Sequence, residues 1–183
     1  MSDRHRSRDT LDAALPTIAS SPRSGRLQAI VVRPDTDLRD DLTACRLSER
    51  GGAEGDRWSK RHPDPSAKDL ESQLTLINTR ALALVAGGRD RWALAGDQLY
   101  VDLDLSVDHL APGDRVRVGG VVLEITPKPH RGCSKFAARF GADALAWLAS
   151  PEGERLRLRG IYARVVVPGE VHVGDAVAKL VGA

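Results

Sequence analysis

The sequence has little cysteine, few aromatic residues and no long apolar run. Its 183 residues include two cysteines, Cys45 and Cys133, which lie far apart and form neither a disulfide framework nor a C-x-x-C redox pair. No apolar run approaches the ~20 residues of a membrane helix. Because aromatic residues make up only 4% of the chain, we expect aliphatic side chains to fill most of the core.

The net charge is also low, which bears on nucleic acid binding. A formal net charge of +2 does not argue for nucleic acid binding, which usually shows a clustered basic face. The arginines near the start are not followed by an apolar stretch, so we expect no secretory signal. Asp3, Asp9 and Asp12 argue against a transit peptide. We therefore expect a cytoplasmic protein that contacts neither nucleic acid nor a membrane.

The chain is predicted to contain one ordered domain. Residues 1–25 are rich in Ser, Arg, Asp and Pro without a sustained period, which predicts a disordered leader; the alternative is a docking tail. The domain is predicted to cover residues 26–183, a typical domain size. Residues 33–70 lack regular periodicity and are predicted to be a long loop that contains the sequence GDRW, residues 55–58.

The strongest local pattern is a hairpin with a Gly-Gly turn at residues 119–120, between alternating apolar runs. About seven strands and two or three short helices are expected, and such spacing favours a barrel or sandwich. The predicted strands are 27–32, 74–77, 98–105, 115–118, 121–125, 161–167, 171–173 and 176–180. The predicted helices are 79–86, 134–140 and 142–149.

Cys133 is the candidate functional thiol. It directly precedes a predicted helix start and stands among Lys128, His130, Arg131 and Lys135, surroundings that lower cysteine pKa values. The same bases and free N–H groups would also suit a phosphate. The alternative is a small buried apolar residue, which we favour for Cys45. His130 and Cys133 have a spacing compatible with zinc, but further ligands are not evident.

Several segments, taken together and in their order along the chain, resemble a MOSC domain, the C-terminal domain of molybdenum cofactor sulfurase. They are GDRW, LAGDQLYVDLDLS, LAPGDRVRVGGVVLEIT, HRGCSKFAARFG and RGIYARVVVPGEVHVGDAV. The resemblance implies a mainly β fold with a closed or partly closed barrel. It also implies binding of the molybdenum cofactor (molybdopterin), with Cys133 as metal ligand and catalytic residue. Asp97 and Gln98 stand where several relatives carry a pair such as Arg-Asn, so no cofactor contact is predicted there.

The resemblance makes an oxidoreductase the leading hypothesis, one that reduces N-hydroxylated small-molecule substrates. The 183 residues contain no G-x-G-x-x-G fingerprint and too few cysteines for an iron–sulfur cluster, so electrons would come from a separate reductase. The alternatives are a non-catalytic carrier of the cofactor or of sulfur, and a barrel that only binds partners. The candidate cofactor-binding residues are Arg57, Lys128, Arg131, Ser134 and Lys135.

Overall fold

The computed structural model describes residues 5–181, and seven strands of this part close into a β-barrel. Neighbouring strands are antiparallel, except that β5 and β6 run parallel. In pairing order the barrel strands are β1 (Ser24–Val32), β11 (Ala176–Lys179), β7 (Arg115–Val118), β8 (Val121–Ile125), β9 (Ile161–Val167), β5 (Leu74–Asn78) and β6 (Leu99–Val101). β6 also pairs with β1, which closes the barrel and confirms the predicted fold class.

The hairpin of β7 and β8 shows how the sequence dictates the barrel. Val116 and Val118 are fully buried while Arg115 and Arg117, which alternate with them, are exposed, because successive side chains of a strand point to opposite faces. At the turn, Gly119 has a φ of 57°, and a Cβ there would lie 2.4 Å from a carboxylate oxygen of Asp175. A glycine is therefore required for this turn to pack against the loop before β11.

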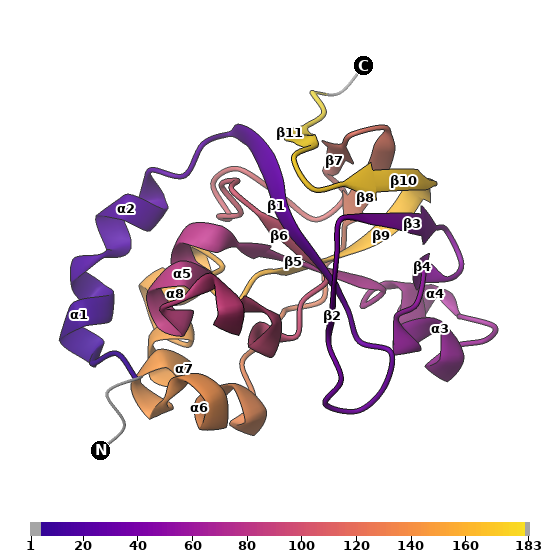
Figure 1. Ribbon diagram of the computed structural model, residues 1–183. Coiled ribbons are helices and arrows are strands. Elements are labelled where there is room, and N and C mark those ends of the chain that lie inside the picture. Colours follow the sequence, from indigo (N-terminus) through magenta and orange to yellow (C-terminus); the bar gives the residue numbers. More distant parts are fainter. Residues whose placement is uncertain (1–4, 182–183) are drawn as a thin grey trace.

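The barrel wall separates two apolar cores, one inside the barrel and one between its outer face and the helices. β1 is buried on both sides: Ile30 and Val32 belong to the barrel interior, whereas Ala29 and Val31 face the helices. This explains why its apolar run is continuous rather than alternating. Figure 1 shows most of the helices gathered on one side of the barrel. They are α1 (Arg8–Ala13), α2 (Leu15–Ala19), α5 (Thr79–Ala86), the 3-10 helix η1 (Arg89–Ala95), α6 (Ser134–Phe140), α7 (Ala142–Leu148) and α8 (Pro151–Arg155).

The amino-terminal segment differs from the predicted leader. Residues 1–4 lie outside the described part, but α1 and α2 pack on the apolar core between the barrel wall and the helices. Leu11 is fully buried and Ile18 nearly so, and the Arg8 main-chain N–H donates to Asp143 of α7 at 3.1 Å. Two well-placed apolar residues thus hold a segment whose overall composition is polar.

The predicted loop at residues 33–70 contains more structure than the sequence indicated. It holds β2 (Asp40–Leu42), β3 (Ala44–Ser48), β4 (Gly52–Ala53), α3 (Arg57–Arg61) and α4 (Ala67–Leu70). β2 extends the sheet beside β1, and β3 pairs with β4 and with β10 (Gly169–His172) in a small second sheet. Cys45 on β3 is buried, as predicted, and burial raises the pKa of its thiol.

Two smaller differences concern the second half of the chain. The segment predicted as a strand at 98–105 forms a strand only over the three residues of β6, and α8 adds a helix that was not predicted. In contrast, α5 and α6 have the predicted bounds. Within residues 5–181, no helix combines the length and the apolar character needed to cross a membrane.

Candidate functional site

Cys133 occupies the turn that leads into α6. Its thiol is exposed, and its backbone is extended, with φ −134° and ψ 174°. The Cys133 carbonyl accepts hydrogen bonds from the N–H groups of Phe136 (2.9 Å) and Ala137 (3.1 Å), which fixes the turn on the helix. On the other side, a Cβ at Gly132 would lie 2.4 Å from Leu145 Cδ1. The glycine thus leaves room for α7 to pack against the chain directly before the thiol.

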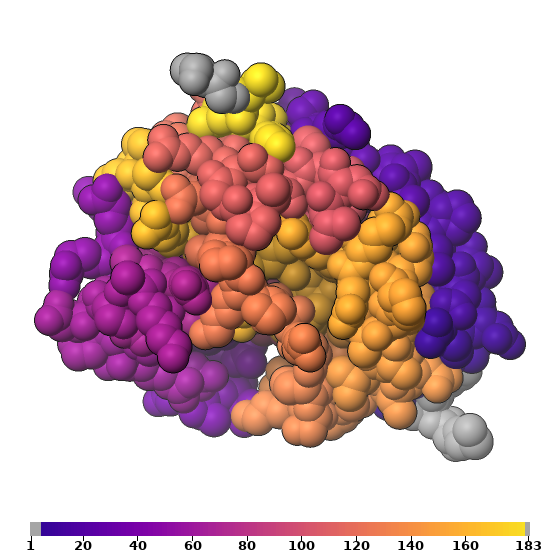
Figure 2. Space-filling view, turned by 180° about the vertical axis from the view of Figure 1, so that it is seen from behind, coloured from indigo at the N-terminus to yellow at the C-terminus, as the bar shows by residue number. Residues whose placement is uncertain are grey.

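A cavity of about 500 Å³ lies beside this turn. Residues 125–132 form one wall, and α7 with residues 153–161 forms the other. Figure 2 shows this face hollowed beside the orange segment of the chain. The apolar part of the lining includes Pro112, Ile125, Leu145, Leu148 and Ile161. The polar part consists of Thr126, Lys128, His130, Arg131, Glu154, Arg157 and Arg159.

A buried group of charged and polar side chains stands at the inner end of this cavity. Arg159 Nη1 donates to Asp97 Oδ2 at 2.7 Å, and the Asp97 side chain is fully buried. The His130 side chain is 6% exposed, and its Nδ1 lies 3.8 Å from Asp97 Oδ1, too far for a hydrogen bond. Three buried atoms of this group, Asp97 Oδ1, His130 Nδ1 and Arg159 Nε, have no hydrogen-bond partner. We call these three residues the inner cluster.

Burial sets the protonation of the inner cluster. Desolvation lowers the pKa of His130 well below its usual value, and the positive charges of Arg159 and Arg33 act in the same direction. The imidazole is therefore neutral at pH 7. Burial raises the pKa of Asp97, although the ion pair with Arg159 opposes this shift. The ring of Tyr162 lies against His130, with 4.4 Å between centroids, and burial raises the pKa of its hydroxyl.

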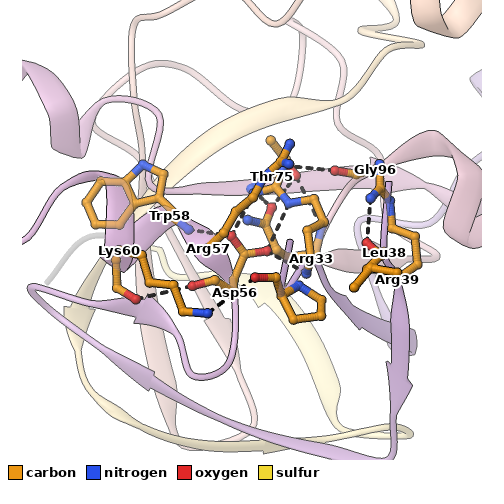
Figure 3. A network of polar contacts seen from close by, with 12 residues as sticks. Arg33, Leu38, Arg39, Asp56, Arg57, Trp58, Lys60, Thr75 and Gly96 are labelled. Carbon is orange, nitrogen blue, oxygen red and sulfur yellow. Dashed lines mark hydrogen bonds and ion pairs between the residues drawn. The ribbon is translucent and has the colours of Figure 1, made fainter. Parts of the chain in front are cut away.

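A second group of arginines surrounds the loop 33–39, between β1 and β2. Asp56 caps α3 by accepting from the Trp58 N–H, and its buried carboxylate also accepts from Arg33 Nε (2.9 Å) and Nη2 (3.1 Å). Figure 3 shows this ion pair with Arg39 and Arg57 nearby. The pKa of Arg39 is lowered by burial and by the charges of Arg139, Arg33 and Arg57. Three other guanidinium groups therefore lie close enough to Arg39 to disfavour its charge.

The two groups are connected through the end of η1. Arg33 Nη1 donates to the Gly96 carbonyl at 3.0 Å, while Arg159 Nη2 donates to the Ala95 carbonyl at 3.1 Å. Residues 95–97 are therefore held by one guanidinium from each group. The position of this segment relative to both groups is for this reason well fixed.

The structure divides the predicted cofactor-binding residues into two sets. Arg57 and Lys135 contact the loop 33–39: Arg57 Nη1 bonds Thr36 Oγ1 at 3.2 Å, and Lys135 Nζ lies 3.6 Å from Asp37 Oδ1. Lys128 and Arg131 line the cavity instead. Lys128 Nζ bonds the Ser72 hydroxyl at 3.0 Å and lies 5.7 Å from the Tyr162 ring centre.

In the chain, Cys133 lies between the cavity-lining residues Lys128 and Arg131 and the loop-contacting residue Lys135. Ser134 is exposed at the first position of α6, immediately after Cys133. Among the residues from 5 to 181, no three His, Cys, Asp or Glu side chains gather closely enough to hold a metal ion by themselves. Any metal at Cys133 would therefore need most of its ligands from another molecule.

Several residues of the site were not found from the sequence. Arg33, Arg39, Asp56 and Arg159 were not predicted, and Asp97 was noted without an assigned contact. The sequence feature that could have identified these residues is their position. Asp56 and Asp97 each follow a glycine, and Arg33 directly follows the apolar run of β1. A charged residue adjoining a buried strand is a candidate for a buried ion pair, but its partner cannot be read from spacing.

Comparison with known proteins agrees with this fold. The chain resembles YiiM from Geobacillus stearothermophilus at 15% identity and a TM-score of 0.60, over 86% of this chain and 75% of that one. It resembles the YuaD protein from Bacillus subtilis at 16% identity and a TM-score of 0.57, over 84% and 94% of the two chains. A search of curated proteins found no match.

A family model identifies the chain more directly than these distant structural likenesses. The model of the MOSC domain matches residues 65–178, which is more than half of the chain. The matched segment includes Cys133, the whole inner cluster and most of the cavity lining. The chain therefore belongs to the MOSC domain family, which is linked to binding of the molybdenum cofactor.

Proposed function

We propose that this protein binds the molybdenum cofactor through Cys133 and uses it to reduce N-hydroxylated compounds. The observation that carries the proposal is the exposed thiol on a fixed turn, with a cavity lined by the residues before it and with Lys135 and Arg139 after it. A thiolate is a soft ligand that suits such a metal centre. The surrounding basic side chains suit an anionic cofactor.

The chemistry of the side chains fits this cofactor. Its phosphate suits the guanidinium groups around the loop 33–39, where Arg57 and Lys135 are our candidates. Ser134, next to the thiol, offers a hydroxyl and a backbone N–H at the start of α6. Two unpartnered atoms of the inner cluster, Asp97 Oδ1 and Arg159 Nε, supply a buried acceptor and a buried donor, which a pterin, rich in both, can satisfy.

When bound, the cofactor supplies a metal centre capable of two-electron redox chemistry. The chain's own residues would bind and orient the cofactor and the substrate. Cys133 would ligate the metal, and Arg57 and Lys135 would hold the phosphate. The neutral imidazole of His130, the one histidine among the described residues that line the cavity, can form a hydrogen bond with a bound substrate. Since the 183 residues contain no nicotinamide-binding fingerprint, we propose that a separate reductase provides the electrons.

A second candidate function is favoured by the exposure of Cys133. A group held on an exposed thiol can be reached by another protein, as transfer by a carrier of the cofactor or of sulfur would require. Turnover distinguishes the two functions. Reduction of an N-hydroxylated compound by the loaded protein with an artificial electron donor would exclude a pure carrier, whereas a loaded but inactive protein would support one.

The first experiment is a measurement of bound molybdenum in protein expressed in a host that makes the cofactor. We expect near-stoichiometric metal in the wild type and in Cys45→Ala, the matched control with a buried thiol, and loss of the metal in Cys133→Ala. Negligible metal in all three proteins would contradict the proposal and leave a barrel that binds partners. Equal loading of wild type and Cys133→Ala would contradict the role of the thiol.

A further inference from the structure

We propose that residues 5–23 form a strap that detaches from the barrel as a unit, and that the docked strap holds α7 and, through it, the turn of Cys133 in place. The strap contains α1 and α2 and ends where β1 begins. Figure 1 shows it as an arm along the helical side of the barrel, with α1 beside α7. The inference concerns how the chain moves and does not rest on the proposed function.

The amino-terminal end of the strap contacts the junction of α6 and α7. The Arg8 main-chain N–H donates to Asp143 Oδ2 at 3.1 Å. Gly141, between the two helices, has a φ of 101°, and a Cβ there would lie 3.1 Å from His5 Cβ and Cγ. This backbone conformation is one that glycine adopts readily and other residues do not, so the junction is a natural hinge. Leu11 then anchors α1 in the apolar core to which the buried face of α7 also belongs.

α7 transmits the position of the strap to the thiol turn. It contacts the strap through Asp143 and the residues before Cys133 through Leu145. Leu145 packs so closely on Gly132 that a Cβ at this glycine would lie 2.4 Å from Leu145 Cδ1. Leu145 and Leu148 also line the cavity. A shift of α7 therefore changes both the width of the cavity and the support of the turn that carries the thiol.

The strap should detach more easily than the barrel unfolds. α1 has six residues and α2 has five, and helices this short are not stable alone in water. They depend on docking, in which Leu11 and Ile18 are their buried side chains. Asp12 Oδ1 is buried and finds no hydrogen-bond partner among residues 5–181, which weakens the docked state. Segments with few buried apolar contacts open locally at a lower free energy than the whole domain.

The other end of the strap is held by α5 and, through it, by the barrel. Arg80 Nη1 donates to the carbonyl oxygens of Thr17 at 3.3 Å and of Ser20 at 3.2 Å. Arg80 Nε donates to Asp102 Oδ1 at 2.8 Å. One guanidinium group thus joins the end of α2 to a carboxylate that directly follows β6. A substitution of Arg80 loosens the strap from the end opposite to its contact with α7.

The test is hydrogen exchange of single amides, followed by NMR in the full-length, metal-free protein. Phe136 and Ala137, whose N–H groups bond the Cys133 carbonyl, report on the thiol turn, and Ala14, bonded to the Leu11 carbonyl, reports on the strap. In Leu11→Ala we expect all three amides to exchange at least about tenfold faster and by the same factor, because truncation of a buried leucine favours the detached strap.

Two further variants make the test specific. Arg80→Gln should speed the same three amides together, by at least about threefold, although it removes no buried apolar group. Ile30→Val is the control, because Ile30 is fully buried inside the barrel. It should speed the β8 amides, which open with the whole domain, by about two- to tenfold, and leave the strap and the thiol turn unchanged.

Two results would overturn the proposal. Faster exchange of Ala14 with unchanged Phe136 and Ala137 would mean that the strap detaches without affecting the thiol turn. Equal acceleration of these amides and of the β8 amides in Ile30→Val would mean that strap and α7 open only when the whole barrel unfolds. Because the exchange is measured without molybdenum, neither result depends on whether the protein loads the metal, and failure to load leaves the strap intact as an inference.

Discussion

Removal of Arg159 should destabilise the protein by far more than removal of a surface arginine. Asp97 is fully buried and the Arg159 side chain is only 11% exposed, so solvent screens their ion pair very little. In Arg159→Gln the carboxylate is left buried without its counter-charge. Breaking a buried pair from one side costs about 3–5 kcal/mol. For a domain of this size we therefore expect a fall in Tm of about 6–20 °C.

The loss of stability in Arg159→Gln should depend on pH. The direction of this dependence follows from the number of protons that the folded protein binds. Without Arg159, the pKa of Asp97 rises further and the pKa of His130 is lowered less, because Arg159 opposes protonation of both groups. The folded variant thus binds more protons than the folded wild type. Stability then falls with rising pH relative to the wild type. The difference in unfolding free energy should be larger at about pH 7.5 than at about pH 5.

Denaturant unfolding at both pH values provides the assay, with Arg164→Gln as the control. Arg164 forms an ion pair of the same length with Glu124, 2.7 Å, but its side chain is 42% exposed. Such pairs contribute about 0–1 kcal/mol. A loss in Arg159→Gln no larger than in Arg164→Gln would refute the idea that Asp97 is a buried charge. A difference independent of pH would refute the assigned proton uptake.

Two further predictions concern His130 and the amino-terminal helices. Because burial lowers the pKa of His130, the folded protein binds fewer protons than the unfolded chain below about pH 6.5, so this contribution to stability is lost as the pH falls. The slope should reach at most ~1.4 kcal/mol per pH unit, and His130→Phe should remove it in a denaturant series; an unchanged slope would exclude His130 as its source. Leu11→Ala should cost about 2–5 kcal/mol in the same assay if α1 is part of the core, and almost nothing if residues 5–23 are detached.

The parts of the fold that could be predicted from the sequence are those with local causes. The β7–β8 hairpin follows from alternation on both sides of two glycines. α5 ends at Gly87, and α6 begins directly after Cys133 and ends at Gly141. In contrast, β3 has only five residues, and its pairing with β10, more than a hundred positions later, is set by the whole fold. Its own residues carry no comparable signal.

The candidate site likewise has a part with a local cause in the sequence and a part that depends on the whole fold. Cys133 stood out because its neighbours in the sequence are basic and small. The inner cluster could not be found in this way, since Asp97, His130 and Arg159 are more than 25 residues apart and meet only when the barrel closes. Pairing of buried charges is a property of the folded surroundings, and a buried aspartate looks the same in a sequence as an exposed one.

The position of Cys133 relates the two halves of the site. The residues before the thiol, Lys128 to Gly132, line the cavity, while Lys135 and Arg139 after it form ion pairs with Asp37 of the loop 33–39. One short turn therefore connects the cavity lining with the side chains that contact the loop 33–39. In our proposal, the phosphate of a cofactor held on the thiol contacts Arg57 and Lys135, while a second molecule occupies the cavity. We therefore expect Arg57 and Lys135 to affect cofactor loading, and Lys128 and Arg131 to affect it less than they affect substrate binding.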